Sequence, residues 1–301
     1  MTRRQWLAIA ASGPALAQNR KPDEVTFRAD VRLVRLLVTV RDPSGQLVGG
    51  LDKTDFTVQD SGVPQSISIF ERQTELPLSV ALMVDTSGST AKDLKYEVQA
   101  ASRFVKAVVR EGNPNDAIAL YSFNHEVIRQ SNFTRNAQRI EKALPQLKAE
   151  AGTSMYDAIV LGSEGLAGRQ GRKVMVVVTD GGDTTSYRNY HDALRAAHDA
   201  DAILYALVVM PITNDAGRNV GGENALTQIS RSTGGRAFFP SAGPTLDQAF
   251  TDILRDLRTQ YLVGYYPKNL PPAPDRFRRV SIALGRAGLR ASTRDGYYGD
   301  N

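Results

Sequence analysis

The chain has 301 residues, of which 42% are hydrophobic, and its formal net charge at pH 7 is +5. This length is enough to bury a large core, so we expect one sizeable domain and a second, smaller unit. Cysteine is absent, which excludes disulfides, thiolate nucleophiles and zinc sites built on cysteine.

The first residues have the character of an export signal. Residues 2–7 read T-R-R-Q-W-L, close to the twin-arginine pattern, and a weakly apolar stretch then ends in Ala15-Leu16-Ala17, typical of a cleavage site. A general secretory signal or an ordinary amphipathic start is the alternative. The stretch is too short to span a bilayer. We predict a signal peptide over residues 1–17 and a mature chain without a transmembrane segment, exported to the periplasm or the cell exterior.

Short β-type segments follow the predicted signal. Three segments have strand character: Val31–Arg41, Asp55–Gln59 and Ser66–Phe70. The turn sequences Asp42–Gly45 and Asp60–Gly62 separate them, because Asp, Pro, Ser and Gly favour turn geometry. Residues 25–75 therefore predict a small sheet-rich unit.

From Leu78 onward, strands and helices alternate. The predicted strands are Leu78–Val84, Ala117–Phe123, Glu126–Arg129, Lys173–Thr179, Ala202–Val209 and Ala237–Phe239. The predicted helices are about Ala91–Arg110, Ala137–Leu147, a segment after Thr153, Tyr190–Asp199, Asn224–Ser232 and Thr245–Arg258. This alternation predicts an α/β domain over residues 76–259 with a doubly wound, mostly parallel sheet. In such sheets a ligand site forms beyond the carboxyl ends of the strands, at a topological switch point.

β character returns after the last predicted helix. Gln260–Tyr266 is strand-like, and Phe277–Leu284 and Leu289–Thr293 alternate like the two strands of a hairpin. These segments can pair with the early strands. We therefore predict a β-sandwich-like unit made of residues 25–75 and 260–298, with the α/β domain inserted between its halves.

Arginines crowd this C-terminal segment: Arg276, Arg278, Arg279, Arg286, Arg290 and Arg294. On alternating strands they would form a solvated face, and a patch for nucleic acid or an anionic surface is the alternative. No nucleic-acid-binding motif accompanies them, so we expect no nucleic-acid partner.

The most informative motif follows the predicted strand Leu78–Val84. It reads D-T-S-G-S and places the oxygen-bearing residues Asp85, Ser87 and Ser89 at every second position, with Gly88 expected to let the turn close tightly. Hard oxygen ligands suit a hard divalent cation, Mg²⁺ above all. The alternative is that this turn only caps the next helix.

Two later segments extend the motif. Thr153 follows a glycine and opens a helix, and Asp180 ends the predicted strand Lys173–Thr179. Asp85, Ser87, Ser89, Thr153 and Asp180 together resemble the metal-ion-dependent adhesion site of the von Willebrand factor type A (VWFA) family. The sequences at 260–267 and 294–298 resemble exported VWFA-related acidobacterial domain proteins, and this likeness covers nearly all of the mature chain.

The resemblance implies a Rossmann-like type A domain and a role for each site residue. Ser87 and Ser89 would donate hydroxyl oxygens to Mg²⁺, Thr153 would bind directly or through water, and Asp85 and Asp180 would act mostly through water. Mn²⁺ or Ca²⁺ is possible in place of Mg²⁺. A partner protein's Asp or Glu would fill the open position. Loops expected at the rim of the site are Thr90–Asp93, Asn124–His125, Gly181–Arg188 and Pro211–Glu223.

The predicted function is therefore an exported, metal-dependent, protein-binding module of adhesion type, and not an enzyme. Asp183 and Asp157 are expected to be loop caps or groups that support the site. Movement of the last helix, about residues 245–258, is a weaker hypothesis for a switch. The partner and the oligomeric state stay open.

Two other functions compete with this prediction. One is a structural subunit of an envelope complex whose metal only stabilises the fold. The other is a Mg²⁺-dependent hydrolase, but Ser87 stands where phosphatases of the D-x-D type have a second Asp. The phosphate-binding loop and the G-x-S-x-G elbow are also absent from the sequence.

Overall fold

The computed structural model describes residues 33–72, 75–210, 219–241 and 243–299. The predicted signal peptide at 1–17, the start of the first β-segment and residues 211–218 of the last rim loop lie outside this range. Within the described residues, no helix combines the length and apolar character needed to cross a membrane.

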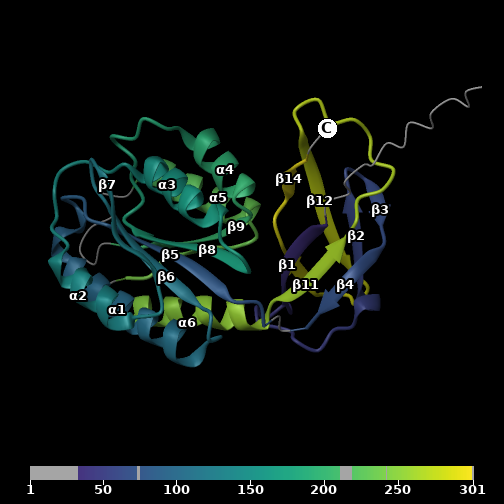
Figure 1. Ribbon diagram of the computed structural model, residues 1–301, viewed down its shortest axis with the longest axis horizontal. Helices are drawn as coiled ribbons and strands as arrows, with labels where there is room; N and C mark the ends of the chain where they lie inside the picture. The colour runs from purple at the N-terminus through teal and green to yellow at the C-terminus, as the bar shows by residue number, and fades with distance from the viewer. Residues whose placement is uncertain (1–32, 73–74, 211–218, 242, 300–301) are drawn as a thin grey trace, which may run out of the picture. The chain divides into compact units, whose positions relative to one another are not determined.

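A six-stranded sheet forms the centre of the α/β domain (Figure 1), in the spatial order β10-β9-β8-β5-β6-β7. All neighbouring pairs are parallel except β6 and β7, which are antiparallel. The bounds are β5 (Leu78–Asp85), β6 (Ala117–Phe123), β7 (Val127–Thr134), β8 (Arg172–Thr179), β9 (Ala202–Val208) and β10 (Ala237–Phe238). The chain runs from β5 to β6 on one side and later returns to β8 on the other, so the switch point lies at β5.

Helices cover both faces of this sheet, as Figure 1 shows. α1, α2 and α6 pack on one face and α3, α4 and α5 on the other, which buries β5 along its whole length. The bounds are α1 (Leu94–Glu111), α2 (Ala137–Ala143), α3 (Met155–Ala167), α4 (Tyr190–Asp199), α5 (Val220–Ser232) and α6 (Pro244–Thr259). Short 3₁₀ helices lie at η1 (Lys53–Asp55), η2 (Thr90–Lys92) and η3 (Leu144–Gln146).

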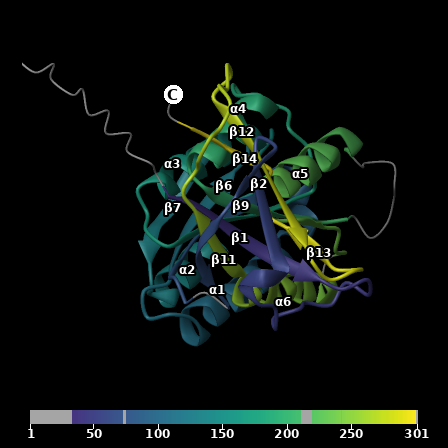
Figure 2. The ribbon, with the colours of Figure 1, turned by 90° about the vertical axis from the view of Figure 1, so that its right-hand side faces the viewer.

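The first and last strands together form two four-stranded sheets, which we call the β-unit. Their orders are β13-β1-β11-β4 and β14-β12-β2-β3, and their inner faces share one hydrophobic core. Figure 2 shows β1 and β11 from the beginning and the end of the chain lying side by side. The bounds are β1 (Val34–Arg41), β2 (Phe56–Asp60), β3 (Val63–Gln65), β4 (Ile67–Glu71), β11 (Tyr261–Tyr265), β12 (Phe277–Leu284), β13 (Arg290–Ser292) and β14 (Gly296–Tyr298).

The predicted fold class is confirmed, but one local prediction is wrong. β12 and β13 do not form a hairpin: β12 pairs with β2 and β14, whereas β13 pairs with β1 in the other sheet. The alternation of apolar residues in both segments reports only that each has one buried face. It carries no information on which strand each one joins.

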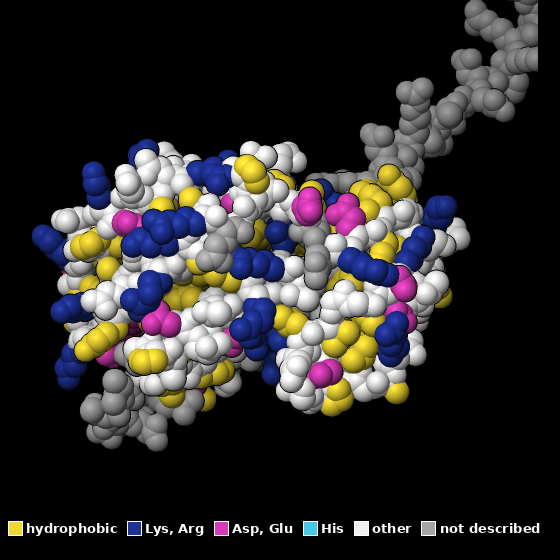
Figure 3. All heavy atoms as spheres, turned by 90° about the horizontal axis from the view of Figure 1, so that it is seen from below, with side chains coloured by type: hydrophobic (Ala, Val, Ile, Leu, Met, Phe, Trp, Pro, Cys, Tyr) yellow, Lys and Arg dark blue, Asp and Glu magenta, His cyan; other side chains and the backbone are white. Residues whose placement is uncertain are grey.

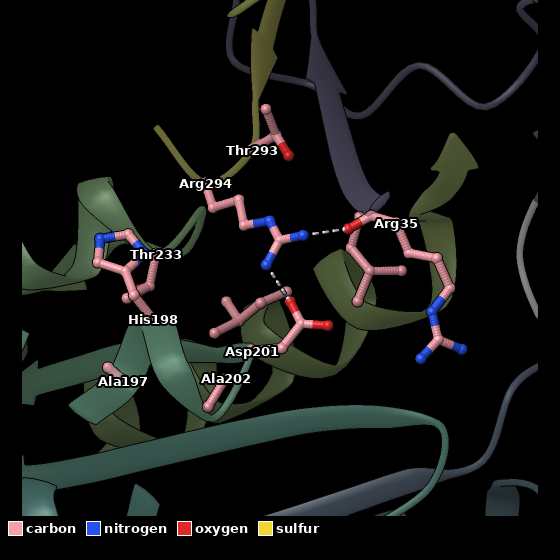
Figure 4. Close-up of a pocket in the computed structure, with 10 residues that line it drawn as sticks. Arg35, Ala197, His198, Asp201, Ala202, Thr233, Thr293 and Arg294 are labelled. Carbon is pink, nitrogen blue, oxygen red and sulfur yellow. Dashed lines mark hydrogen bonds and ion pairs between the residues drawn. The ribbon is translucent and has the colours of Figure 1, made fainter. Parts of the chain in front are cut away.

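Ion pairs join the β-unit to the α/β domain. Asp256 of α6, with 3% of its side chain exposed, binds Arg41 of β1 and also Arg236, whose Nε lies 3.0 Å from Oδ2. Arg294 donates to Asp201 Oδ1 at 2.7 Å and to the Arg35 carbonyl at 2.9 Å (Figure 4). Because Asp256 is buried, the junction should be sensitive to the loss of this carboxylate.

The prediction of a solvated arginine face is therefore wrong for Arg294, whose side chain is only 13% exposed. Arg276, Arg279, Arg286 and Arg290 are exposed, and Arg286 pairs with Asp55. On the face seen in Figure 3, basic side chains are interspersed with acidic, apolar and neutral ones. This mixture is ordinary for a solvated surface.

Candidate metal centre

The turn after β5 brings the first three predicted residues together. Asp85, the last residue of β5, is fully buried, and its Oδ1 accepts a hydrogen bond from the Ser87 amide at 2.8 Å. The Ser87 and Ser89 hydroxyl oxygens lie 3.0 Å apart. Thr90 fastens the turn, because its hydroxyl donates to the Ser87 carbonyl at 2.9 Å. One carboxylate and two hydroxyls thus share a short, hydrogen-bonded turn at the carboxyl edge of the sheet.

This turn does not act as a cap for the helix that follows. The N-cap of α1 is Asp93, which makes no side-chain capping bond, and Asp85 and Ser87 bond within their own turn. The expectation about Gly88 is also wrong. Its φ is not positive, and the nearest atom to a Cβ built there, the Glu150 carbonyl oxygen, is 3.9 Å away. The hydrogen bond that Asp85 accepts from the Ser87 amide and the one that Thr90 donates to the Ser87 carbonyl close the turn, and a glycine conformation does not.

Asp180 directly follows β8, the strand that pairs with β5. Strands β5 and β8 are paired with Val84 opposite Val178, so the residues after them meet at the same edge. Thr179 makes the connection: its hydroxyl donates to Asp85 Oδ2 at 2.5 Å and accepts from the Gly181 amide at 3.0 Å. Asp180 itself is partly exposed, which leaves its carboxylate open to solvent at the rim.

Thr153 is held by its backbone at the start of α3. Its amide donates to the Thr184 hydroxyl at 3.0 Å, and its carbonyl accepts from the Thr184 amide at 2.9 Å. The residue is only 5% exposed, yet its hydroxyl has no hydrogen-bond partner among the described residues. The loop that follows Asp180 therefore positions Thr153 and leaves its hydroxyl available as a ligand.

Asp183 and Asp157 are loop caps, as the sequence predicted. Asp183 Oδ1 accepts from the Tyr156 amide at 3.2 Å, in the first turn of α3. Asp157 accepts from the amides of Tyr187 and Arg188 at 3.0 and 2.8 Å. Together they fasten the loop after Asp180 to the beginning of α3.

Negative charge is crowded at this edge of the sheet. Burial raises the pKa of Asp85 from 3.8 to about 7, and repulsion from Asp180 adds to the rise, while hydrogen bonds from Thr179 and Ser87 oppose it. Groups of three or more His, Asp or Glu side chains that could hold a metal do not occur among the described residues. A metal at this edge would thus depend on the hydroxyls as well as the carboxylates. The donor set, with the unpartnered Thr153 hydroxyl, fits a hard divalent cation.

The sequence analysis missed two residues of this region. One is Thr179, which bridges the two strands. The other is Glu97 of α1, a glutamate with only 1% exposure. A signal for Glu97 was present in the spacing, because it lies one helical turn before Ala101 in the apolar stripe of α1.

The comparisons with known proteins agree with this architecture. Residues 80–182 match the sequence model of the von Willebrand factor type A domain. The chain therefore contains a von Willebrand factor type A domain.

Solved structures and a curated relative show how far the similarity extends. The vWF domain of the type V pili tip protein Mfa5 from Porphyromonas gingivalis superposes with a TM-score of 0.51 at 14% identity, over 60% of this chain and 95% of that chain. The conserved hypothetical protein BatB from Bacteroides thetaiotaomicron gives a TM-score of 0.48 at 18% identity, over 60% and 98%. The uncharacterized protein sll0103 from Synechocystis sp. is 29% identical over 110 residues, which is 35% of this chain and only 26% of that protein.

Proposed function

We propose that this chain is an exported, protein-binding module of adhesion type. Asp85, Ser87, Ser89, Thr153 and Asp180 would hold Mg²⁺, and a partner protein's Asp or Glu would complete the coordination. The main support is the turn after β5, where a buried carboxylate and two hydroxyls 3.0 Å apart share one edge of the sheet. The type A fold is shared with a domain of a pili tip protein, which favours a role in attachment outside the cell.

The side chains of this site would have different roles in binding the metal. Bound Mg²⁺ would supply a positive centre that attracts a carboxylate. Ser87, Ser89 and Thr153 would be neutral ligands, so they would leave most of that charge uncompensated. Asp85 is oriented by Thr179 and the Ser87 amide, and with Asp180 it would balance the charge from a distance. Such a site would hold the metal and still favour one further anion.

A structural role for the metal is the second candidate. Both Asp85 oxygens already accept hydrogen bonds from the chain, so the turn is ordered by internal contacts alone. In this case a metal would stabilise the fold within an envelope complex, without contact to a partner's carboxylate. We assign no catalytic residues in either case.

Titration calorimetry with Mg²⁺ tests the metal site. Wild type should bind one Mg²⁺, and Asp85→Ala and Ser87→Ala should abolish or strongly weaken binding. Ser281→Ala, at an exposed position of β12, is the matched control and should bind as wild type does. Unchanged binding by Asp85→Ala would refute the proposed site.

Affinity capture from the envelope of the source cell tests the partner. A partner held through a carboxylate on the metal should be recovered in Mg²⁺ and lost in EDTA, and Asp85→Ala should not capture it. Capture that ignores EDTA would favour the structural role. Sequencing of the N-terminus of the secreted protein checks export, and it should begin at Gln18.

A further inference from the structure

Glu97 is a buried acid to which the proposed site gives no role. Only 1% of the residue is exposed, and neither carboxyl oxygen finds a hydrogen-bond partner within the described part of the chain. Burying a carboxyl group without partners is costly, and folded proteins rarely keep such a group without a reason. A bound ligand that interacts with this carboxyl group would provide that reason.

The helix places Glu97 next to the candidate metal turn. α1 begins at Leu94, directly after the 3₁₀ helix that follows the D-T-S-G-S motif, and the Glu97 amide donates to the Asp93 carbonyl at 3.1 Å in the first turn. Ala100 and Ala101, one turn further on, are 1% and 0% exposed. Residues three and four apart share a helix face, so Glu97 lies on the side of α1 that packs against the sheet, at the end nearest the turn.

The electrostatic surroundings of Glu97 are the carboxylates of the site. Burial raises its pKa well above 4.5, and the charges of Asp85, Asp93 and Asp180 raise it further. These interactions put the Glu97 carboxyl within electrostatic reach of both acidic residues of the proposed site. A divalent cation between them would turn this repulsion into attraction.

Ordinary structural roles do not account for this residue. α1 has no side-chain capping bond at its N-terminus, so Glu97 does not cap the helix. No ion pair to a Lys, Arg or His involves Glu97 among the described residues. The position is occupied by a carboxyl group that the folded chain itself does not use.

On the basis of the proposed function, we propose that Glu97 is an outer carboxylate that supports the metal centre without binding the ion directly. It would act as a positioning residue behind the direct ligands, with its oxygens accepting hydrogen bonds from water molecules on the cation. Mg²⁺ keeps several of its waters in protein sites, and the hydrogens of those waters need acceptors. Outer partners of this kind orient the inner ligands and tune metal affinity.

Calorimetry on Glu97→Gln tests this inference, because the amide keeps the size of the side chain and removes the charge. Its affinity for Mg²⁺ at pH 8 should fall about 10- to 100-fold. Glu164→Gln, on the exposed side of α3, is the matched control and should bind as wild type does. In EDTA, Glu97→Gln should melt at or above the temperature of wild type, because the variant no longer buries an acid without partners.

The possible results separate this inference from the proposed function. If wild type binds Mg²⁺, Asp85→Ala does not, and Glu97→Gln binds as tightly as wild type, only the role of Glu97 is overturned. If wild type binds no Mg²⁺, the metal site and the inference fall together. A metal-free Glu97→Gln that melts well below wild type would show that the carboxyl group serves the fold, and this would also overturn the inference.

Discussion

Without metal, the protein should lose stability as the pH rises, and Asp85 should be a main cause. Burial raises its pKa from 3.8 to about 7 in the folded state. The folded chain therefore holds this proton more tightly than the unfolded chain does. The resulting stabilisation is fully present below about pH 4 and is lost as the pH rises through about 7.

The size of this loss follows from the pKa shift. One pKa unit corresponds to about 1.4 kcal/mol, so a rise of about three units corresponds to about 4 kcal/mol, more than half of it between pH 5 and pH 8. Asp85→Asn removes the titration and keeps the shape of the side chain. Burial lowers the pKa of His198, so its contribution runs in the opposite direction, and it cancels when the variant is compared with wild type.

Urea denaturation in EDTA between pH 5 and pH 8 measures this effect on wild type and Asp85→Asn. The variant should gain stability over wild type progressively as the pH rises. Saturating Mg²⁺ should restore wild type at pH 8, because the cation compensates the ionised carboxylate. A difference between the two proteins that stays constant across this pH range would refute the reasoning.

Two further predictions concern packing and are measured by urea denaturation. Asp256→Ala should lower the free energy of unfolding by about 3–5 kcal/mol, because two arginines lose a buried partner, whereas Asp252→Ala, at a partly exposed pair on the same helix, should cost less than about 1 kcal/mol. A Cβ at residue 222 would lie 1.3 Å from the Gly181 carbonyl oxygen, so Gly222→Ala should cost at least about 2 kcal/mol and weaken Mg²⁺ binding. Gly88→Ala should change neither the free energy of unfolding nor the binding of Mg²⁺. Equal urea midpoints for Asp256→Ala and Asp252→Ala would contradict the first prediction. Equal midpoints for Gly222→Ala and Gly88→Ala would contradict the second.

The sequence predicted several elements of both parts of the chain well because their local signals are strong. β6, α4 and β12 begin and end at the predicted residues, since each has a clear alternation of buried and exposed positions or clear flanking turns. Asp85 and Asp180 also meet at one sheet edge, as parallel strands require.

Other structural features could not be predicted from local sequence patterns. α5 begins at Val220, four residues before the predicted start. Two glycines weaken its helical signal, and one of them, Gly222, is needed because α5 approaches Gly181 closely. β3 is only three residues long and contains Pro64, which is acceptable because β3 lies at the edge of its sheet. Tertiary contacts, which no short window contains, decide both cases.

Glu97 shows the same limit at the site itself. A glutamate in the first turn of a helix ordinarily faces water and favours the helix dipole. The spacing of Glu97 from Ala101 indicates an inward-facing position, but the packing of α1 on the sheet shows that the residue is enclosed. The D-T-S-G-S motif predicts the ligands that it contains. The position of the Glu97 carboxylate near them is decided by the three-dimensional arrangement.

The two connections of the α/β domain have a mechanical consequence. β4 leads into this domain and β11 leads out of it, and the two strands are paired, with Glu71 opposite Leu262. A pull on a partner seated at the metal would reach the β-unit through both strands at once. The load would run along the strands and shear the hydrogen bonds between β11 and β1 together, instead of peeling them apart singly. A tether of two strands is suited to an attachment that must hold under tension.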